Sequence, residues 1–150
     1  MEFEKAGLSD HVLVRSAADS KDTEIPNIES EYRMGYDLTV ELLREGQPVT
    51  AIAALNDMMA FGAMDAMKAS GISYGVDGDV ILISFDACTA GLEYVMSGDI
   101  NADFECNPLA APFVEDVIKQ LESGSTPDKE VYMVEHWYVN EDICLLYTSP

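Results

Sequence analysis

Polar side chains stand at the ends of successive apolar runs in this sequence. Asn56, Asp86 and Glu105 each follow such a run, and Asn107 stands two residues beyond Glu105. Carboxylate oxygens accept hydrogen bonds, whereas an asparagine amide both donates and accepts them. This combination suits a neutral ligand that carries several hydroxyl groups, such as a sugar. If the runs are parallel strands, their carboxyl ends meet at one edge of a sheet, which is where such folds bind ligands.

Each of these residues also has a structural interpretation. Asn56 or Asp57 could cap the helix that follows, because both residue types favour that position. We interpret Asp57 as a cap or first-turn residue, and Asp86 stays open between capping the next helix and contacting a ligand. Asn107 is interpreted first as a cap of the helix beginning at Pro108 and second as a ligand contact.

Glu105 is the strand-end residue that a structural role explains least, because glutamate is a poor helix cap. Its neighbour Cys106 is interpreted as a small buried hydrophobe rather than a nucleophile. His11 and His136 are interpreted as ordinary surface or edge residues. The sequence contains no motif of an activated nucleophile, a phosphate loop or a zinc site. We therefore predict a protein that is not an enzyme, with no metal and no cofactor.

The elements that would position these residues alternate regularly. Apolar runs and amphipathic stretches succeed one another with short connections, which predicts an α/β domain with a mostly parallel sheet covered by helices on both faces. Strands are predicted over 11–17, 50–55, 80–85 and 100–105, helices over 29–45, 57–70, 89–97 and 109–123, and an extended segment over 130–139. The run at 80–85 is predicted to be buried on both faces.

Composition narrows the functional classes. The 150 residues suit one domain, and 8 basic against 28 acidic residues give a net charge of −20. Such a charge opposes binding to nucleic acid and to anionic lipid surfaces. No apolar run is long enough to cross a membrane, so direct membrane insertion is not expected. The 3 cysteines form neither a zinc pattern nor a disulfide framework.

The segment 143–150 continues no periodicity of the preceding sequence. It resembles the in-frame translation of an adapter used to build sequencing libraries, and our hypothesis is a non-native tail. An ordinary C-terminal strand is the alternative. The domain prediction is therefore confined to residues 1–142.

Several of these segments resemble one family. The segment Ala51–Ala63 is similar to the ND-x-MA-x-GA junction of type I periplasmic binding proteins, which also occurs in the effector domains of LacI-type repressors. Ile83–Asp86 resembles their GFD strand end, with Ser84 in place of the usual glycine. Glu105–Leu109 matches a variant of the sugar-transport receptors, and the resemblance covers roughly residues 3 to 142.

This resemblance implies a flavodoxin-like, three-layer lobe of a bilobal protein. It implies that Asn56 and Asp86 bind ligand, with a third contact within Glu105–Asn107. The chain would be the C-terminal lobe without its first strand and most of its first helix. The implied function is the substrate-binding component of an ABC-type sugar importer, whose partners are a sugar and the permease. Its location would be periplasmic or extracellular, free or lipid-anchored at the cell surface. The alternative is the effector domain of a LacI-type regulator.

Overall fold

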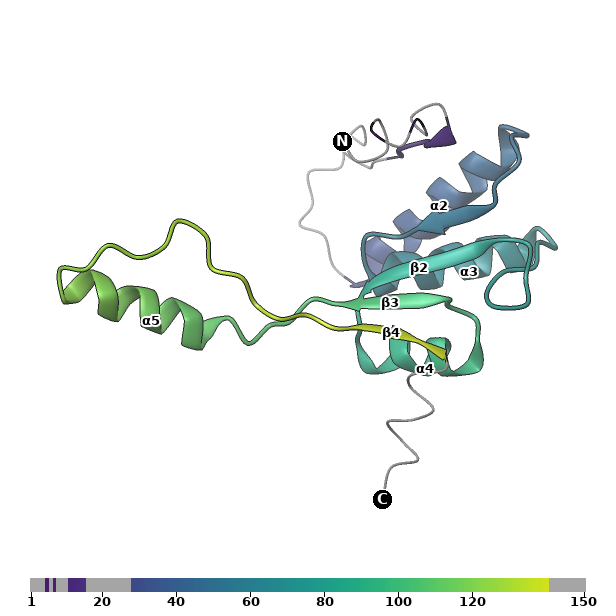
Figure 1. Cartoon of the computed structure of the whole chain (residues 1–150). Coiled ribbons are helices and arrows are strands. Elements are labelled where there is room, and N and C mark those ends of the chain that lie inside the picture. Colours follow the sequence, from purple (N-terminus) through teal and green to yellow (C-terminus); the bar gives the residue numbers. More distant parts are fainter. Residues whose placement is uncertain (1–4, 6, 8–10, 16–27, 141–150) are drawn as a thin grey trace, which may run out of the picture.

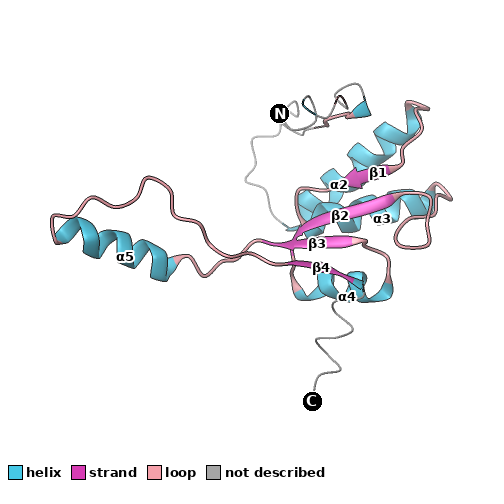
Figure 2. Ribbon diagram, viewed as in Figure 1, coloured by secondary structure: helices cyan, strands magenta, loops and turns pink. Residues whose placement is uncertain are grey.

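The computed structural model describes residues 5, 7, 11–15 and 28–140 of the chain. Helices and strands alternate along this part, as Figure 2 shows. The elements are α2 (Ile28–Arg44), β1 (Ala51–Ala53), α3 (Asp57–Ala69), β2 (Ile81–Asp86), α4 (Thr89–Ser97), β3 (Ala102–Glu105), α5 (Ala111–Glu122) and β4 (Trp137–Val139). None of the described helices has the length and apolarity needed to cross a membrane. The predicted tail at 143–150 lies outside the described residues.

The strands form one sheet in the order β1-β2-β3-β4. β1, β2 and β3 are parallel, whereas β4 pairs with β3 in the antiparallel direction. Helix α3 connects β1 to β2 and helix α4 connects β2 to β3, as parallel neighbours require. The α/β fold with a mostly parallel sheet, predicted from the sequence, is confirmed.

The core lies between the sheet and the helices α3 and α4. Leu82 of β2, Met67 of α3 and Val95 of α4 are fully buried in one cluster. On the opposite face of β2, Ile81 is 48% and Phe85 39% exposed. The prediction that this run is buried on both faces was therefore wrong for the described structure, because the packed helices of the described residues cover one face of the sheet.

Helices α2 and α3 approach one another closely through glycines. A Cβ on Gly35 would lie 2.1 Å from the carbonyl oxygen of Met59, and one on Gly62 would lie 2.0 Å from that of Tyr32. Only a residue without a side chain leaves room for backbones at this separation. This close contact between α2 and α3 fixes the position of the start of α3, and hence of the end of β1.

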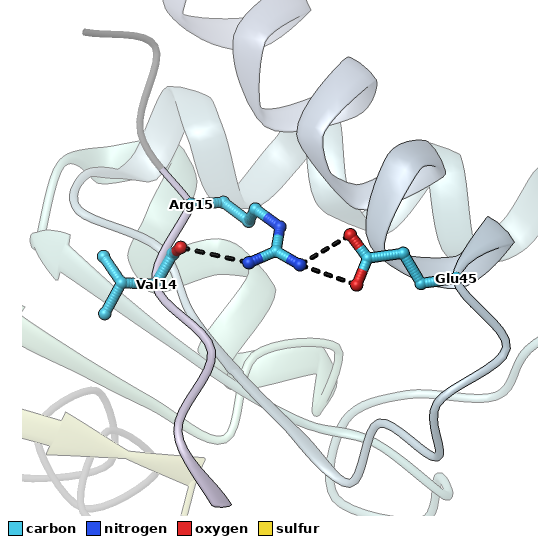
Figure 3. Close-up of polar contacts among 3 residues, drawn as sticks. All are labelled: Val14, Arg15 and Glu45. Atoms are coloured by element: carbon cyan, nitrogen blue, oxygen red, sulfur yellow. Dashed lines mark hydrogen bonds and ion pairs between the residues drawn. The ribbon is translucent and has the colours of Figure 1, made fainter. Parts of the chain in front are cut away.

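The predicted strand at 11–17 is not found in its described part. Residues 11–15 carry no strand assignment, and 16–17 lie outside the described residues. An ion pair ties this segment to the end of α2: the Arg15 guanidinium donates to both carboxylate oxygens of Glu45, at 2.5 and 2.6 Å (Figure 3). Leu13 and Arg15 line a groove of about 140 Å³ together with the residues of β1, and among the described residues no strand pairing joins this segment to β1.

Helix α5 stands away from the sheet. The chain leaves β3, forms α5 at a distance and returns along an extended path to β4 (Figure 1). None of the residues of α5 is buried, although Phe113, Ile118 and Leu121 are large and apolar. The predicted extended segment at 130–139 is a strand only from Trp137 to Val139.

Candidate functional site

The carboxyl ends of the parallel strands bring the predicted residues to one edge of the sheet. Asp86 is the last residue of β2 and Glu105 the last of β3, and the two are direct partners in the strand register. Asn56 follows β1 three residues after the strand ends, immediately before α3. The fold therefore places an amide and two carboxyl groups at the edge where parallel sheets bind ligands.

Asp86 occupies an unusual backbone conformation. Its φ angle is 115° and that of Ala87 is 54°, and neither residue is glycine. Positive φ values in such residues are strained, and they concentrate at functional sites. Asp86 does not cap α4, because the N-cap is Cys88, whose Sγ accepts from the amide of Gly91 at 3.4 Å. Of the two roles left open by the sequence, capping is therefore excluded.

The Asp86 carboxyl group is exposed at the edge of the sheet, yet its electrostatic surroundings are unfavourable to charge. Partial burial raises its pKa, and the negative charges of Asp57 and Glu31 raise the pKa further. Within the described residues, no donor forms a hydrogen bond with this carboxyl group. Its oxygens are thus available to accept hydrogen bonds from a hydroxylated molecule.

Asn56 is the N-cap of α3. Its Oδ1 accepts a hydrogen bond from the amide of Met59 at 2.9 Å. This contact uses only the oxygen of the amide group. The Nδ2 donor forms no hydrogen bond with the described residues, so the same side chain can cap the helix and donate to a ligand.

Asp57 is a first-turn residue, as predicted, but its side chain does more than favour the helix terminus. It is 1% exposed, and its carboxylate accepts from the Ser84 hydroxyl at 2.5 Å and from the Cys88 amide at 2.8 Å. Ser84, which stands where the resembling family has glycine, is therefore the donor that links β2 to the start of α3. Asp57 faces the interior rather than the ligand edge.

His136 contacts Glu105 at this edge of the sheet, a contact that its sequence position gave no reason to expect. Glu105 Oε2 lies 2.7 Å from His136 Nδ1 and accepts from the His136 amide at 3.1 Å. These hydrogen bonds lower the pKa of Glu105. His136 is exposed and directly precedes β4, in keeping with a surface or edge residue, but its contact with Glu105 was not expected from the sequence. The signal that could have placed it is the apolar stretch after it, which returns beside β3 as β4.

The residues after Glu105 differ from their predicted roles. Asn107 does not cap a helix at Pro108, because α5 begins at Ala111; instead its Oδ1 accepts from the amide of Leu109 at 2.9 Å. Such a bond stabilises a turn. Cys106 is exposed rather than buried. Because the strand stops at Glu105, the chain here is already turning away from the sheet.

Among the described residues, no group of histidine, cysteine or acidic side chains is arranged to hold a metal ion. The arrangement offers acceptors from Asp86 and Glu105 and a donor from Asn56. Such a set of groups can form hydrogen bonds with a polar molecule.

Comparisons with known proteins find sequence similarity over parts of the chain. No family model matches the chain. It is 46% identical over 52 residues to the HTH-type transcriptional regulator GalR of Salmonella typhimurium, a stretch that covers 35% of the chain and 15% of the regulator. It is 31% identical over 85 residues to the galactofuranose-binding protein YtfQ of Escherichia coli, covering 56% of the chain and 26% of that protein.

Solved structures extend the similarity to most of the chain. A protein of Mycobacterium smegmatis in complex with β-D-fucofuranose matches with a TM-score of 0.65 and 25% identity, over 76% of this chain and 37% of that one. The arabinose-binding periplasmic component of an ABC transporter from Shewanella sp. ANA-3 matches with the same TM-score and identity, over 77% and 39%. The chain is related to the type I periplasmic binding proteins. It has the fold of one lobe of these proteins.

As a lobe of this type, the chain spans less than half the length of the proteins it resembles. The structural similarity covers 76% and 77% of this chain, and it agrees with the family prediction made from the junctions at 51–63, 83–86 and 105–109. Two of the matching structures hold furanose sugars, by their own descriptions.

Proposed function

We propose that this chain is the C-terminal lobe of a sugar-binding protein, and that its Asn56, Asp86 and Glu105–Asn107 contact the sugar. The observation that carries the proposal is Asp86: an exposed carboxyl group held at a strand end by strained backbone, opposite Glu105 in the register. The furanose complexes of the structural relatives support a sugar as the ligand. Binding, not turnover, is the proposed activity.

The proposed mode of binding follows from the donors and acceptors. Asp86 accepts hydrogen bonds from two hydroxyl groups of the sugar, and Asn56 Nδ2 donates to a third oxygen. His136 holds the Glu105 carboxylate at the same edge, so a second acceptor is fixed before the ligand arrives. Preorganised groups of this kind lose little freedom on binding, which favours affinity.

Two features of the packing support the proposal that a further lobe completes the structure. The outer edge of β1 has no strand partner among the described residues, and the groove of about 140 Å³ lies along it. Helix α5 carries apolar side chains with nothing described against them. Both surfaces fit a chain whose first strand and first lobe are contributed by sequence outside residues 1–142. Closure of two such lobes around the ligand would be the working motion.

We further propose that the complete protein is the substrate-binding component of an ABC-type importer, located in the periplasm or outside the cell and either free or lipid-anchored. Its partners would be the sugar and the permease. Similarity to components of ABC transporters supports this assignment, and the net charge of −20 argues against a surface for nucleic acid. The stretch shared with GalR supports a second candidate, the effector domain of a LacI-type regulator.

Calorimetry tests the proposed function. The complete protein is titrated with a panel of pentoses and hexoses that includes arabinose, galactose, fucose and ribose, and its Asp86→Ala variant is titrated in parallel. We expect heat from at least one sugar and a loss of at least about tenfold in affinity on substitution, equivalent to about 1.4 kcal/mol. Absence of heat for every sugar would rule out the sugar assignment. The coding sequence upstream separates the candidates, because an importer needs an export signal and a regulator a DNA-binding segment.

A further inference from the structure

Two buried carboxylic acids lie beneath the turn that carries Asp86. Asp57, at the start of α3, is 1% exposed and Asp103, in β3, is 0% exposed. Asp103 is the register partner of Ser84, which donates to Asp57, so the three side chains gather on the helix-covered face of the sheet. Two carboxylates buried this closely cannot both carry a charge without a large penalty.

One oxygen of this pair lacks a hydrogen-bond partner. Asp103 Oδ2 is buried with no donor, whereas the Asp57 oxygens accept from Ser84 and Cys88. A Cβ on Gly91 would lie 2.5 Å from Asp103 Oδ2 and 2.6 Å from Asp57 Oδ2, so both oxygens face the same glycine-lined space. A proton on Asp103 Oδ2 would make this oxygen a hydrogen-bond donor, and the facing Asp57 carboxylate would accept the bond.

The electrostatic surroundings favour a protonated Asp103. Burial and then the negative charge of the adjacent Asp57 raise the pKa of Asp103 to about 7, against the opposing effect of the Ala87 and Phe104 amides. The titratable groups around the pair are Cys88 before α4, Asp86 at the end of β2 and Tyr138, which is opposite Asp103 in β4. The Asp57 carboxyl group thus favours retention of the proton on Asp103.

The same two acids hold the Asp86 turn. The amide of Ala87 donates to Asp103 Oδ1 at 3.2 Å, and the amide of Cys88 donates to Asp57 Oδ2 at 2.8 Å. These amides follow Asp86, whose backbone and that of Ala87 have positive φ. Each acid therefore secures one end of a strained segment that would otherwise relax.

We propose that Asp57 and Asp103 hold one proton between them, and that the protonated pair positions the Asp86 carboxyl group for ligand binding. When the pair loses its proton, two negative charges face each other beneath the turn, and they separate or admit water. The turn then loosens, and Asp86 is no longer fixed. The inference rests on the proposed function, because it makes these acids positioning residues for a ligand contact.

Nuclear magnetic resonance tests the shared proton without any ligand. The Cγ shifts of Asp57 and Asp103 and the amide shifts of Ala87 and Cys88 are followed in the full chain from about pH 5 to about pH 8. We expect one carboxyl proton to be lost near the pKa of about 7, with both amides following the same midpoint. Titration of both carboxyl groups entirely below about pH 5 would overturn the proposal.

The Asp103→Asn variant tests whether the proton of Asp103 causes the titration of the two amides. Asn at position 103 keeps an acceptor for Ala87 and supplies a permanent donor toward Asp57, so in Asp103→Asn the two amides should not titrate across this range. Asp116→Asn, an exposed change on α5, is the matched control and should keep the wild-type midpoint. Unchanged titration of the Ala87 and Cys88 amides in Asp103→Asn would also overturn the proposal. If that variant does not fold, the wild-type titration decides alone.

A ligand measurement then connects the pair to binding. This measurement uses the complete protein and a sugar from the panel that gives heat. The affinity should be about tenfold weaker at pH 8 than at pH 6, because the fraction of molecules whose Asp57–Asp103 pair holds the proton falls about tenfold. Asp103→Asn should remove this dependence and keep the pH 6 affinity. Equal pH dependence in both proteins contradicts the positioning role. Absence of any sugar binding would remove the proposed function and leave the resonance result to decide on the shared proton.

Discussion

The Asn56 side chain serves two roles with two different atoms, and substitutions can separate them. Aspartate also caps helices, so Asn56→Asp should keep the bond from the Met59 amide and change the free energy of unfolding by no more than about 0.5 kcal/mol. It removes the Nδ2 donor and adds a negative charge beside Asp86, so sugar affinity should fall at least about tenfold. Urea unfolding and calorimetry measure the two effects.

Asn56→Ala is the companion variant, since it removes both roles. It should lower the free energy of unfolding by about 1 kcal/mol through the lost cap, and it should also lower the affinity for the sugar. If Asn56→Asp binds sugar as tightly as the wild type, Asn56 is a cap and no more.

Residue type and position predicted which side chains stand at the strand ends, but not which of them face a ligand. Asp57 and Asp86 are both acids that follow apolar strands, yet one is buried and the other exposed. The difference depends on the turn at Asp86 and on Ser84, which is a partner for Asp57 only after the sheet has formed. Asp103 was missed because an acid inside an apolar strand gives no sign of its partner until the register with Ser84 is known.

At the scale of elements, the α2–α3 contact decides where the first strand end lies. In Gly62→Ala, the helix gains intrinsic propensity of about 1 kcal/mol, but the new Cβ would lie 2.0 Å from the Tyr32 carbonyl oxygen. Because the obstacle is backbone, the helices must separate, and we expect a net loss of about 1–3 kcal/mol in urea unfolding.

Lys68→Ala, on the exposed side of the same helix, is the control for this experiment. Its effect should stay within about 0.5 kcal/mol. A Gly62→Ala variant that is as stable as the wild type would show that the two helices do not depend on this close approach.

Periodicity predicted the elements that bury an apolar face, and it was less successful where no partner is described. The helices α2, α3 and α4 and the strand β2 match their predicted ranges closely, because each packs in one layered core. The apolar residues at 11–17 match a strand pattern, but pairing requires a neighbour at the right place, and Leu13 faces a groove instead. An apolar pattern shows that a segment is compatible with a strand, but strand pairing also requires a neighbouring strand in the folded structure.

At the scale of the whole molecule, stability should depend on pH through Asp103. Its pKa in the folded chain, about 7, lies above the value of about 3.9 in an unfolded chain, so the folded state holds more protons between these values. The contribution of Asp103 to the free energy of unfolding is therefore largest below about pH 4, and it falls as the pH rises to about 7. The net charge of −20 acts in the same direction by self-repulsion.

Salt distinguishes these two contributions. Repulsion among exposed charges is screened at high ionic strength, whereas a buried pair is screened much less. In about 1 M sodium chloride, the wild type should retain a decrease in stability between about pH 5 and about pH 8 that Asp103→Asn lacks. Identical pH profiles of the two proteins at high salt would show that Asp103 does not titrate in this range.

Helix α5 contributes differently from the rest of the molecule, because its apolar residues lie outside the core. Leu121→Ala should change the free energy of unfolding of the chain by less than about 0.5 kcal/mol, since Leu121 is exposed. Leu82→Ala, at a fully buried site of the same residue type, should lower it by about 2–5 kcal/mol. In the complete protein the proposed first lobe covers α5, and Leu121→Ala should then become destabilising. An equal effect of Leu121→Ala in both contexts would mean that α5 does not pack against that lobe.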